Sequence, residues 1–100
     1  MVKHIVFFKL EKYNSLDGKK LQVKRLDEIF SPLGHILPFI VDFKTGINYN
    51  EASHAWDFAI DSVFRNKADL EKYLVSEEHL NAVKTASAIE KTKAVIDHEF

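Results

Sequence analysis

The spacing of hydrophobic residues divides the chain into strands and helices. A run rich in β-branched and aromatic residues at 2–10 is typical of a strand that starts almost at the first residue. Because side chains alternate between the two faces of a strand, the even-numbered positions share one face, which includes His4. This is the more apolar face, so we expect it to be buried and His4 to lie among hydrophobic side chains.

A helix is predicted after this strand. It begins near Ser15 or Asp17, and hydrophobic residues then recur every three or four positions, as in an amphipathic helix. Pro32 and Gly34 end or interrupt this pattern, because proline lacks a backbone donor and glycine tolerates unusual backbone angles. The remaining extended patterns lie at 39–48, 55–64 and 92–100.

Two further helices are predicted between the last two strands. Asn66 and Ser76 are suitable N-terminal caps, and acidic residues follow each of them in the first turn. The predicted order is therefore β-α-β-β-α-α-β, which is close to a split βαβ arrangement. We expect an α+β fold in which a four-stranded antiparallel sheet carries helices on one face.

The opposite face of this sheet is expected to be bare and apolar at its centre. The residues assigned to it are Ile5, Phe7, Ala59 and Val95, mixed with Lys3, Asp57, Asp61 and Asp97. An apolar sheet face needs a cover, and a second identical chain is the simplest one. The pattern therefore predicts a homodimer through the open sheet face, with the aspartates serving its polar contacts.

Composition narrows the class of protein. A length of 100 residues fits a single domain, 1–100, and the formal net charge of −1 with no basic cluster argues against a nucleic-acid partner. No apolar run is long enough to span a membrane or to form a signal peptide. With no cysteine, disulfides and thiolate chemistry are excluded, and a cytoplasmic location is the default expectation.

Four short motifs resemble the stress-responsive A/B-barrel (Dabb) family, in the order in which that family carries them. The motifs are Val2-Lys3-His4-Ile5-Val6-Phe7-Phe8-Lys9-Leu10, Asp57-Phe58-Ala59-Ile60 with Phe64, Leu70-Glu71-Lys72-Tyr73-Leu74 with Glu78-His79, and Val95-Ile96-Asp97-His98-Glu99. The resemblance implies a ferredoxin-like fold and a homodimer whose two sheets form a dimeric α/β barrel. Family functions are scattered, and one plant member is a polyketide cyclase, olivetolic acid cyclase.

The same resemblance implies candidate catalytic residues. The cyclase uses a His–Tyr pair in a cavity between sheet and helices, without metal or cofactor, and by motif position this pair falls on His79 and Tyr73, with His4 as a neighbour. A further pocket histidine of the cyclase is Phe58 here, and the His-Pro of the family segment is Ser76-Glu77.

Each candidate also has a structural interpretation. His79 lies in the first turn of a predicted helix, where a neutral imidazole can act as a base, or it can simply bond to backbone or solvent. Tyr73 can donate a hydrogen bond to a substrate oxygen or can pack in the core. His4 can orient the base through Tyr73 or His79, or be a satisfied core histidine. The five histidines of the chain include no zinc-ligand spacing, so no metal is expected.

Two functions remain open, and whether the protein is an enzyme remains open with them. One is a site for a small apolar or aromatic molecule, with cofactor-free acid–base chemistry and a cavity of roughly 300 Å³ or more under the helices. Its expected apolar walls are Phe8, Phe30, Trp56 and Phe58. The other is a structural or stress-related homodimer in which the same residues complete the core.

Overall fold

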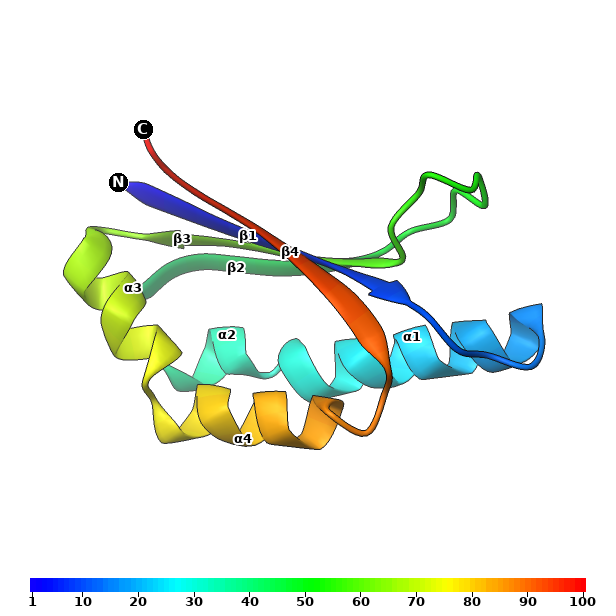
Figure 1. Ribbon diagram of the computed structural model, residues 1–100. Helices are drawn as coiled ribbons and strands as arrows, with labels where there is room; N and C mark the ends of the chain where they lie inside the picture. Colours follow the sequence, from blue (N-terminus) through cyan, green and yellow to red (C-terminus); the bar gives the residue numbers. More distant parts are fainter.

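The computed structural model describes residues 1–100 and contains four strands and four helices (Figure 1). In chain order they are β1 (Val2–Leu10), α1 (Leu16–Phe30), α2 (Leu33–Ile36), β2 (Ile40–Ile47), β3 (Phe58–Phe64), α3 (Lys67–Leu74), α4 (Glu77–Ala86) and β4 (Lys91–Glu99). The predicted elements are all present. The short helix α2 is an addition that follows Pro32, whose fixed φ suits the start of a helix.

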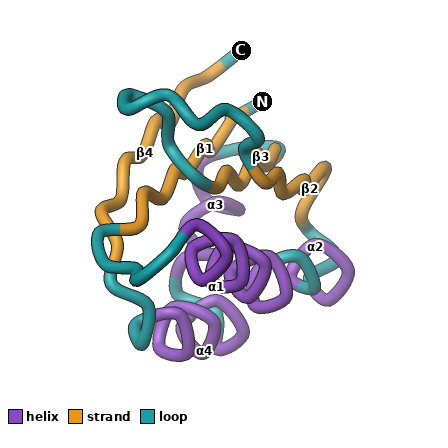
Figure 2. The backbone as a smooth tube through the Cα atoms, turned by 90° about the vertical axis from the view of Figure 1, so that its right-hand side faces the viewer, coloured by secondary structure: helices purple, strands orange, loops and turns teal.

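The strands form one antiparallel sheet in the order β2-β3-β1-β4. All four helices lie on one face of this sheet, and the other face is uncovered (Figure 2). Within the helix layer, α4 lies farther from the sheet than α1 and packs against α1 and α3. The predicted fold class, an α+β sheet with helices on one face, is confirmed.

Local sequence signals set the helix starts. The side chain of Ser15 accepts a hydrogen bond from the backbone N–H of Gly18, Asn66 caps α3 through Asp69, and Ser76 caps α4 through His79. Each cap satisfies one of the backbone donors that the first turn of a helix leaves without a partner. The capping of α4 by Ser76 matters most here, because it fixes the backbone of His79.

The core lies between β1, β3 and the helices, where 17 buried residues form one hydrophobic cluster. Leu26 and Phe64 are fully buried in it. Gly34 of α2 faces Phe43 of β2 so closely that an added Cβ would lie 2.7 Å from the Phe43 Cβ. This glycine therefore allows α2 to approach the sheet.

The registers of the strands correct part of the predicted face assignment. Val6 lies opposite Val95 and His4 lies opposite Asp97, so Val95 and Asp97 are on the helix side of the sheet and not on the bare face. Their neighbours in β4 take the outer positions instead. The prediction was wrong because alternation within a strand shows which residues share a face but not which face that is.

Two other details differ from the predicted pattern. A bulge in β2 between Ile40 and Asp42 shifts the alternation, so that Ile40 and Phe43 both lie opposite helix-side residues of β3. Asp57 lies just before β3 and is buried at the end of the sheet, where its Oδ2 accepts from the backbone N–H of Leu10 at 2.7 Å. Asp57 is thus a structural residue of the fold and not part of the bare face.

Candidate functional site

The three predicted catalytic residues come together in the structure from three elements. His4 lies on β1, Tyr73 on α3 and His79 on α4. The ring centroids of Tyr73 and His79 are 4.6 Å apart, and those of His4 and Tyr73 are 6.2 Å apart. His4 lies far from Tyr73 and His79 in the sequence, so the proximity of the three residues is a product of the fold. We call this set, with Asp97, the histidine–tyrosine cluster.

His79 is held as a neutral imidazole with one nitrogen free. Its Nδ1 lies 3.0 Å from the carbonyl oxygen of Leu74, and because a carbonyl can only accept, Nδ1 carries the proton. Burial lowers the pKa of His79, and the positive charge of Lys93 and the nearby His4 lower it further, against the opposing effect of the Leu74 carbonyl. In this tautomer Nε2 holds a lone pair, as a general base requires.

Tyr73 is buried and aromatic side chains surround it. Only 2% of its surface is exposed, and its ring contacts those of Phe43 and Phe64 as well as His79. Burial raises the pKa of Tyr73 well above its ordinary value, since the phenolate would be desolvated. The hydroxyl therefore stays protonated near neutral pH and is available as a hydrogen-bond donor.

His4 is oriented by Asp97, a residue that the sequence pattern had placed on the bare face. The Nδ1 of His4 and the Oδ1 of Asp97 are 2.5 Å apart. The expected hydrogen bond from His4 to Tyr73 or His79 is therefore replaced by a carboxylate partner on the neighbouring strand. The reason is the pairing of β1 with β4, which sets His4 directly opposite Asp97.

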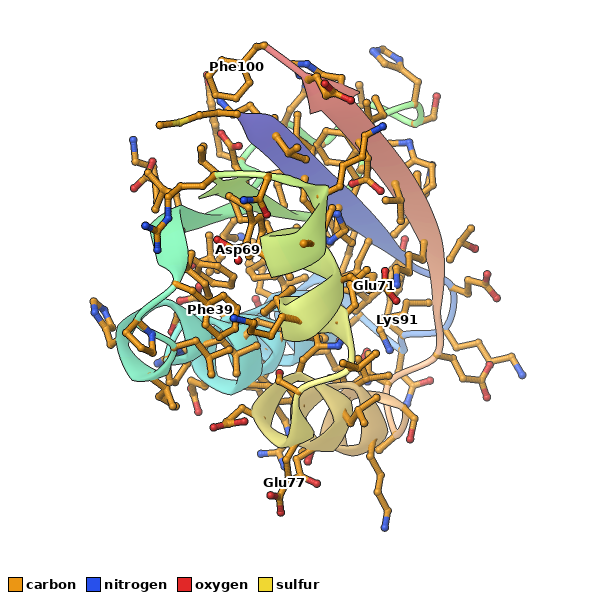
Figure 3. The ribbon with its side chains drawn as sticks, turned by 90° about the vertical axis from the view of Figure 1, so that its left-hand side faces the viewer. Phe39, Asp69, Glu71, Glu77, Lys91 and Phe100 are labelled. Carbon is orange, nitrogen blue, oxygen red and sulfur yellow. The ribbon has the colours of Figure 1, made fainter.

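The cluster borders an open seam between β4 and the helices. We call this the β4 seam and define it by the helix-side residues of β4, which are Lys91, Lys93, Val95, Asp97 and Glu99. No helix packs closely against β4, and Val95 remains 44% exposed although it points to the helix layer. Figure 3 shows this side of the molecule, where Glu71 of α3 and Lys91 of β4 both lie along the seam. His79 of α4 is half-buried, so part of its surface stays in contact with solvent.

A pocket lies at each end of the seam. One, of about 340 Å³, lies between α3 and the last residues of β4 and includes Leu74 and Asp97. The other, of about 160 Å³, lies between α4 and the first residues of β4 and includes Val83, one turn after His79. His4, Tyr73 and His79 themselves line none of the five main pockets. The cluster therefore lies between two pockets that its neighbours form.

The four predicted apolar wall residues are divided between two places. Phe8 and Phe30 line the 160 Å³ pocket of the seam, which is smaller than the cavity expected under the helices. Trp56 and Phe58 line a shallow pocket of about 430 Å³ together with Phe7 and other residues. The sequence showed that these residues are apolar, but only the packing of the elements decides which pocket each one lines.

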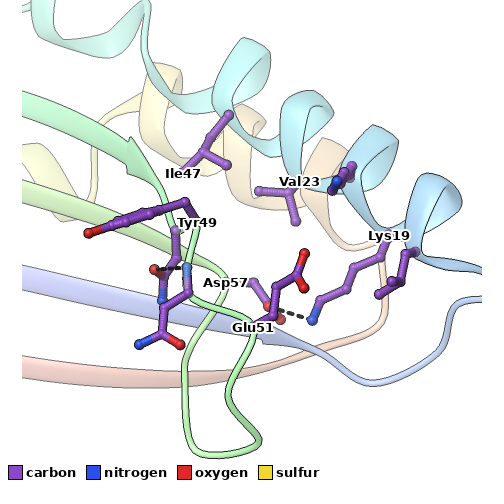
Figure 4. A pocket seen from close by; sticks show the side chains of 10 residues that line it. Lys19, Val23, Ile47, Tyr49, Glu51 and Asp57 are labelled. Carbon is purple, nitrogen blue, oxygen red and sulfur yellow. Dashed lines mark hydrogen bonds and ion pairs between the residues drawn. The ribbon is translucent and has the colours of Figure 1, made fainter.

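A further pocket of about 170 Å³ lies between the start of α1 and the loop that follows β2 (Figure 4). At its wall the Nζ of Lys19 lies 2.9 Å from the Oδ1 of Asp57, and this hydrogen bond raises the pKa of Lys19. Asp57 also holds the backbone of Leu10, so both of its oxygens have partners within the protein. These polar groups connect α1 to the sheet, so neither Lys19 nor Asp57 is left without a partner in this pocket.

The structure offers no evident place for a metal ion. It contains no group of three or more histidine, cysteine or carboxylate side chains that could hold one. None of its helices is both long enough and apolar enough to cross a membrane.

Comparison with known proteins identifies the fold class and the family of this chain. The fold is of the ferredoxin-like class, in which helices cover one face of an antiparallel sheet. The sequence pattern of the family described as Stress responsive A/B Barrel Domain, or Dabb, matches residues 2–100. The chain therefore belongs to the Dabb family. In sequence, no curated protein matches it significantly.

Solved structures agree with this assignment. A dimeric protein with a ferredoxin-like fold from Bacteroides fragilis is 30% identical, with a TM-score of 0.85 over 99% of this chain and 95% of its own. The hydroxynitrile lyase of Passiflora edulis is 21% identical, with a TM-score of 0.75 over 97% of this chain and 90% of its own. A Dabb family protein from Mesorhizobium loti is 17% identical, with a TM-score of 0.69 over 99% and 95%. The last two similarities concern the fold alone.

Three residues of the site were missed by the sequence analysis. Asp97 was assigned to the wrong face, and Lys91 and Lys93 were not considered as site residues. A signal for them exists in the alternation of β4, since Lys91, Lys93 and Asp97 occupy every second position on one face. Only the register with β1 shows that this face borders the histidine–tyrosine cluster.

Proposed function

We propose that the protein binds a small apolar or aromatic carbonyl compound in the β4 seam and performs cofactor-free acid–base chemistry on it. The observation that carries this proposal is the tautomer of His79, whose Nδ1 donates to Leu74 and whose Nε2 is left free beside the ring of Tyr73. A half-buried neutral base next to a protonated phenol is a pairing that can carry out enolisation. The cyclase-like chemistry implied by the family resemblance is of this kind.

Each residue has a defined part in the proposed step. The Nε2 of His79 takes a proton from the carbon next to the carbonyl, and the electron pair of that C–H bond moves to form an enolate. The Tyr73 hydroxyl donates a hydrogen bond to the enolate oxygen, where the negative charge develops. His4, held by Asp97 at 2.5 Å, acts as a positioning residue beside Tyr73. No metal or organic cofactor takes part in this step.

Exchange of the methyl hydrogens of acetophenone for deuterium tests the proposal, because its rate reports proton removal directly by NMR. We expect the protein to accelerate exchange and His79→Gln to reduce the acceleration by roughly 10²-fold or more, the usual contribution of a general base. His35→Gln is the matched control, since His35 is an exposed histidine on α2. Tyr73→Phe should also slow exchange while leaving the fold intact.

Two results would contradict this function. Exchange no faster than in buffer would remove the enzymatic part of the proposal, and exchange unaffected by His79→Gln would remove the role of the cluster. If acetophenone also failed to shift any NMR signal of the seam, the remaining function would be that of a structural homodimer in which these residues complete the core.

We further propose that the chain forms a homodimer through the bare sheet face. The outer positions of β1 and β4 carry Ile5, Phe7, Ala94 and Ile96, and Ile96 is 52% exposed. A contiguous apolar surface of this kind is rarely left open to water. The similar protein from Bacteroides fragilis is dimeric, which supports the same assembly here.

A further inference from the structure

The charged residues of the β4 seam are sorted by sign along the strand. Lys91 and Lys93 lie opposite Leu10 and Phe8, and they therefore point to the helix side at the start of β4. Asp97 and Glu99 occupy the same face at the other end of the strand. The seam thus has a basic end beside the smaller pocket and an acidic end beside the larger one.

Only the acidic end pairs with ionisable side chains of the protein itself. Asp97 is paired with His4, and Glu99 lies 2.8 Å from the Nζ of Lys67. Neither Lys91 nor Lys93 takes part in an ion pair. Two neighbouring ammonium groups without a counter-charge at the rim of a pocket are an electrostatic arrangement that favours an anion.

Lys91 is fixed in place while Lys93 is free. The Nζ of Lys91 donates to the carbonyl oxygens of Ala86 at 2.7 Å and Ile89 at 3.2 Å, and it lies 5.3 Å from the centroid of the Phe8 ring. An ammonium group has three donors, so one N–H of Lys91 remains. Lys93 is exposed and lines the same pocket. The two lysines therefore offer an anion one rigid donor group and one adaptable donor group.

The pocket behind these lysines is apolar and fits one aromatic ring. Phe8 and Phe30 form its inner wall, with ring centroids 5.6 Å apart, and Val83 and Ala86 of α4 complete it. Its volume is about 160 Å³. A cavity of ~150 Å³ lined by hydrophobic side chains is large enough for benzene, so a single ring is the occupant that this size suits.

The positive charge of Lys93 also acts on the histidine–tyrosine cluster. It lowers the pKa of His79 and the pKa of Lys91, in both cases in addition to the effect of burial. An anion bound to Lys93 would therefore lie within electrostatic reach of both groups. The pocket is also lined by Val83, one turn after His79 on α4, so a molecule held there lies close to His79.

We propose that the basic end of the β4 seam selects a small aromatic carboxylate, with its ring against the wall formed by Phe8 and Phe30 and its carboxylate on the Nζ of Lys93 and the remaining N–H of Lys91. This assignment names the substrate class of the site proposed above and rests on that proposed function. The carboxylate anchors the molecule, and the apolar wall excludes anions that have no ring. Lys93 is then a specificity-determining residue.

Binding of benzoate, benzamide and acetate to the full-length protein, followed by NMR titration, tests this inference. Benzamide has the shape of benzoate without its charge, and acetate has the charge without the ring. We expect benzoate to bind at least tenfold more tightly than either. Lys93→Gln should bring benzoate to the affinity of benzamide, and Lys93→Arg should restore most of the difference. Lys24→Gln, which alters an exposed lysine on α1, should change nothing.

The outcomes separate this inference from the function on which it rests. Equal binding of benzoate and benzamide, or benzoate binding unaffected by Lys93→Gln, overturns the anion anchor, while His79-dependent exchange of acetophenone can still stand. Acetate binding as tightly as benzoate also overturns it, because the lysines would then attract any anion. If neither benzoate nor acetophenone shifts the signals of the seam, both proposals fail together.

Discussion

His79 combines two properties that depend on its surroundings and not on its chemistry alone. The carbonyl of Leu74 fixes its tautomer, and burial together with Lys93 lowers its pKa. The same imidazole on the surface would be partly protonated near its ordinary pKa and its ring would rotate freely. The structure therefore turns an ordinary histidine into a neutral base with a defined free nitrogen.

The lowered pKa of His79 predicts how stability depends on pH. Since the folded state binds the proton less readily than the unfolded chain, the unfolded state takes up more protons as the pH falls below the ordinary histidine pKa of ~6.5. Stability from this group is thus fully present above pH ~6.5 and is lost as the pH falls through the folded pKa. Urea unfolding between pH 7.5 and 5 should show this loss in the wild type and a smaller one in His79→Gln.

The control for this prediction is His35→Gln, because His35 is exposed on α2. It should follow the pH profile of the wild type. An identical profile for wild type and His79→Gln would mean that the imidazole of His79 titrates in the folded state as it does in the unfolded chain.

At the level of elements, the position of α2 depends on the absence of one side chain. A Cβ on Gly34 would lie 2.7 Å from the Cβ of Phe43, closer than such atoms approach in proteins. Gly46 of β2 has no atom within 4 Å of the same added group. The packing of α2 against β2 therefore requires the glycine at position 34, whereas no neighbouring atom requires the glycine at position 46.

Gly34→Ala is expected to destabilise the protein by about 1–3 kcal/mol, the usual effect of adding a methyl group to a packed site. Gly46→Ala should change the free energy of unfolding by less than about 1 kcal/mol, because alanine restricts the unfolded chain and meets no obstacle in the folded one. Chemical unfolding of both variants provides the measurement. Equal stability of the two would show that α2 can move away from β2 without loss.

The arrangement of strands also explains how distant residues become one site. The pairing of β1 with β4 brings His4 against Asp97, 93 positions away in the chain. The same pairing brings Lys93 opposite Phe8. A shift of this register by one residue would turn both charged side chains to the other face, so the register itself is a requirement of the proposed chemistry.

For the whole molecule, the bare sheet face is the feature that most demands a partner. Ile96 is a suitable test position, because it lies on the outer face opposite Ile5 and is 52% exposed. Ile96→Glu should convert the proposed dimer to a monomer and lower the melting temperature at high protein concentration. Leu21→Glu is the control, since Leu21 is 71% exposed on α1, away from this face.

Sedimentation at several concentrations measures the effect directly. A dimer should dissociate on dilution, and its melting temperature should rise with concentration. A wild-type chain that sediments as a monomer at all concentrations would refute the dimer, and a dimer unaffected by Ile96→Glu would place the interface elsewhere.

Much of the fold could be predicted from local signals. The caps Asn66 and Ser76 lie where the sequence placed them, Ser15 is the one of two candidates that caps α1, and the four strands appear in the predicted order. These features are set by residues close in the chain, so periodicity and capping chemistry are sufficient to find them. The bulge in β2 and the helix α2 were not foreseen, because the bulge is a feature of the pairing of β2 with β3 and α2 is only 4 residues long.

By itself, then, the sequence determined the α+β class and the order of the elements. It also carried the motifs that indicate the Dabb family, and it placed His4 among apolar side chains. The tertiary structure alone decided that Asp97 and not Tyr73 bonds to His4, that His79 keeps a free Nε2, and that Lys91 and Lys93 lie beside Phe8. The physical reason is that alternation and helical periodicity act over a few residues, whereas a strand register joins residues as far apart as Val2 and Glu99 and depends on the packing of the whole sheet.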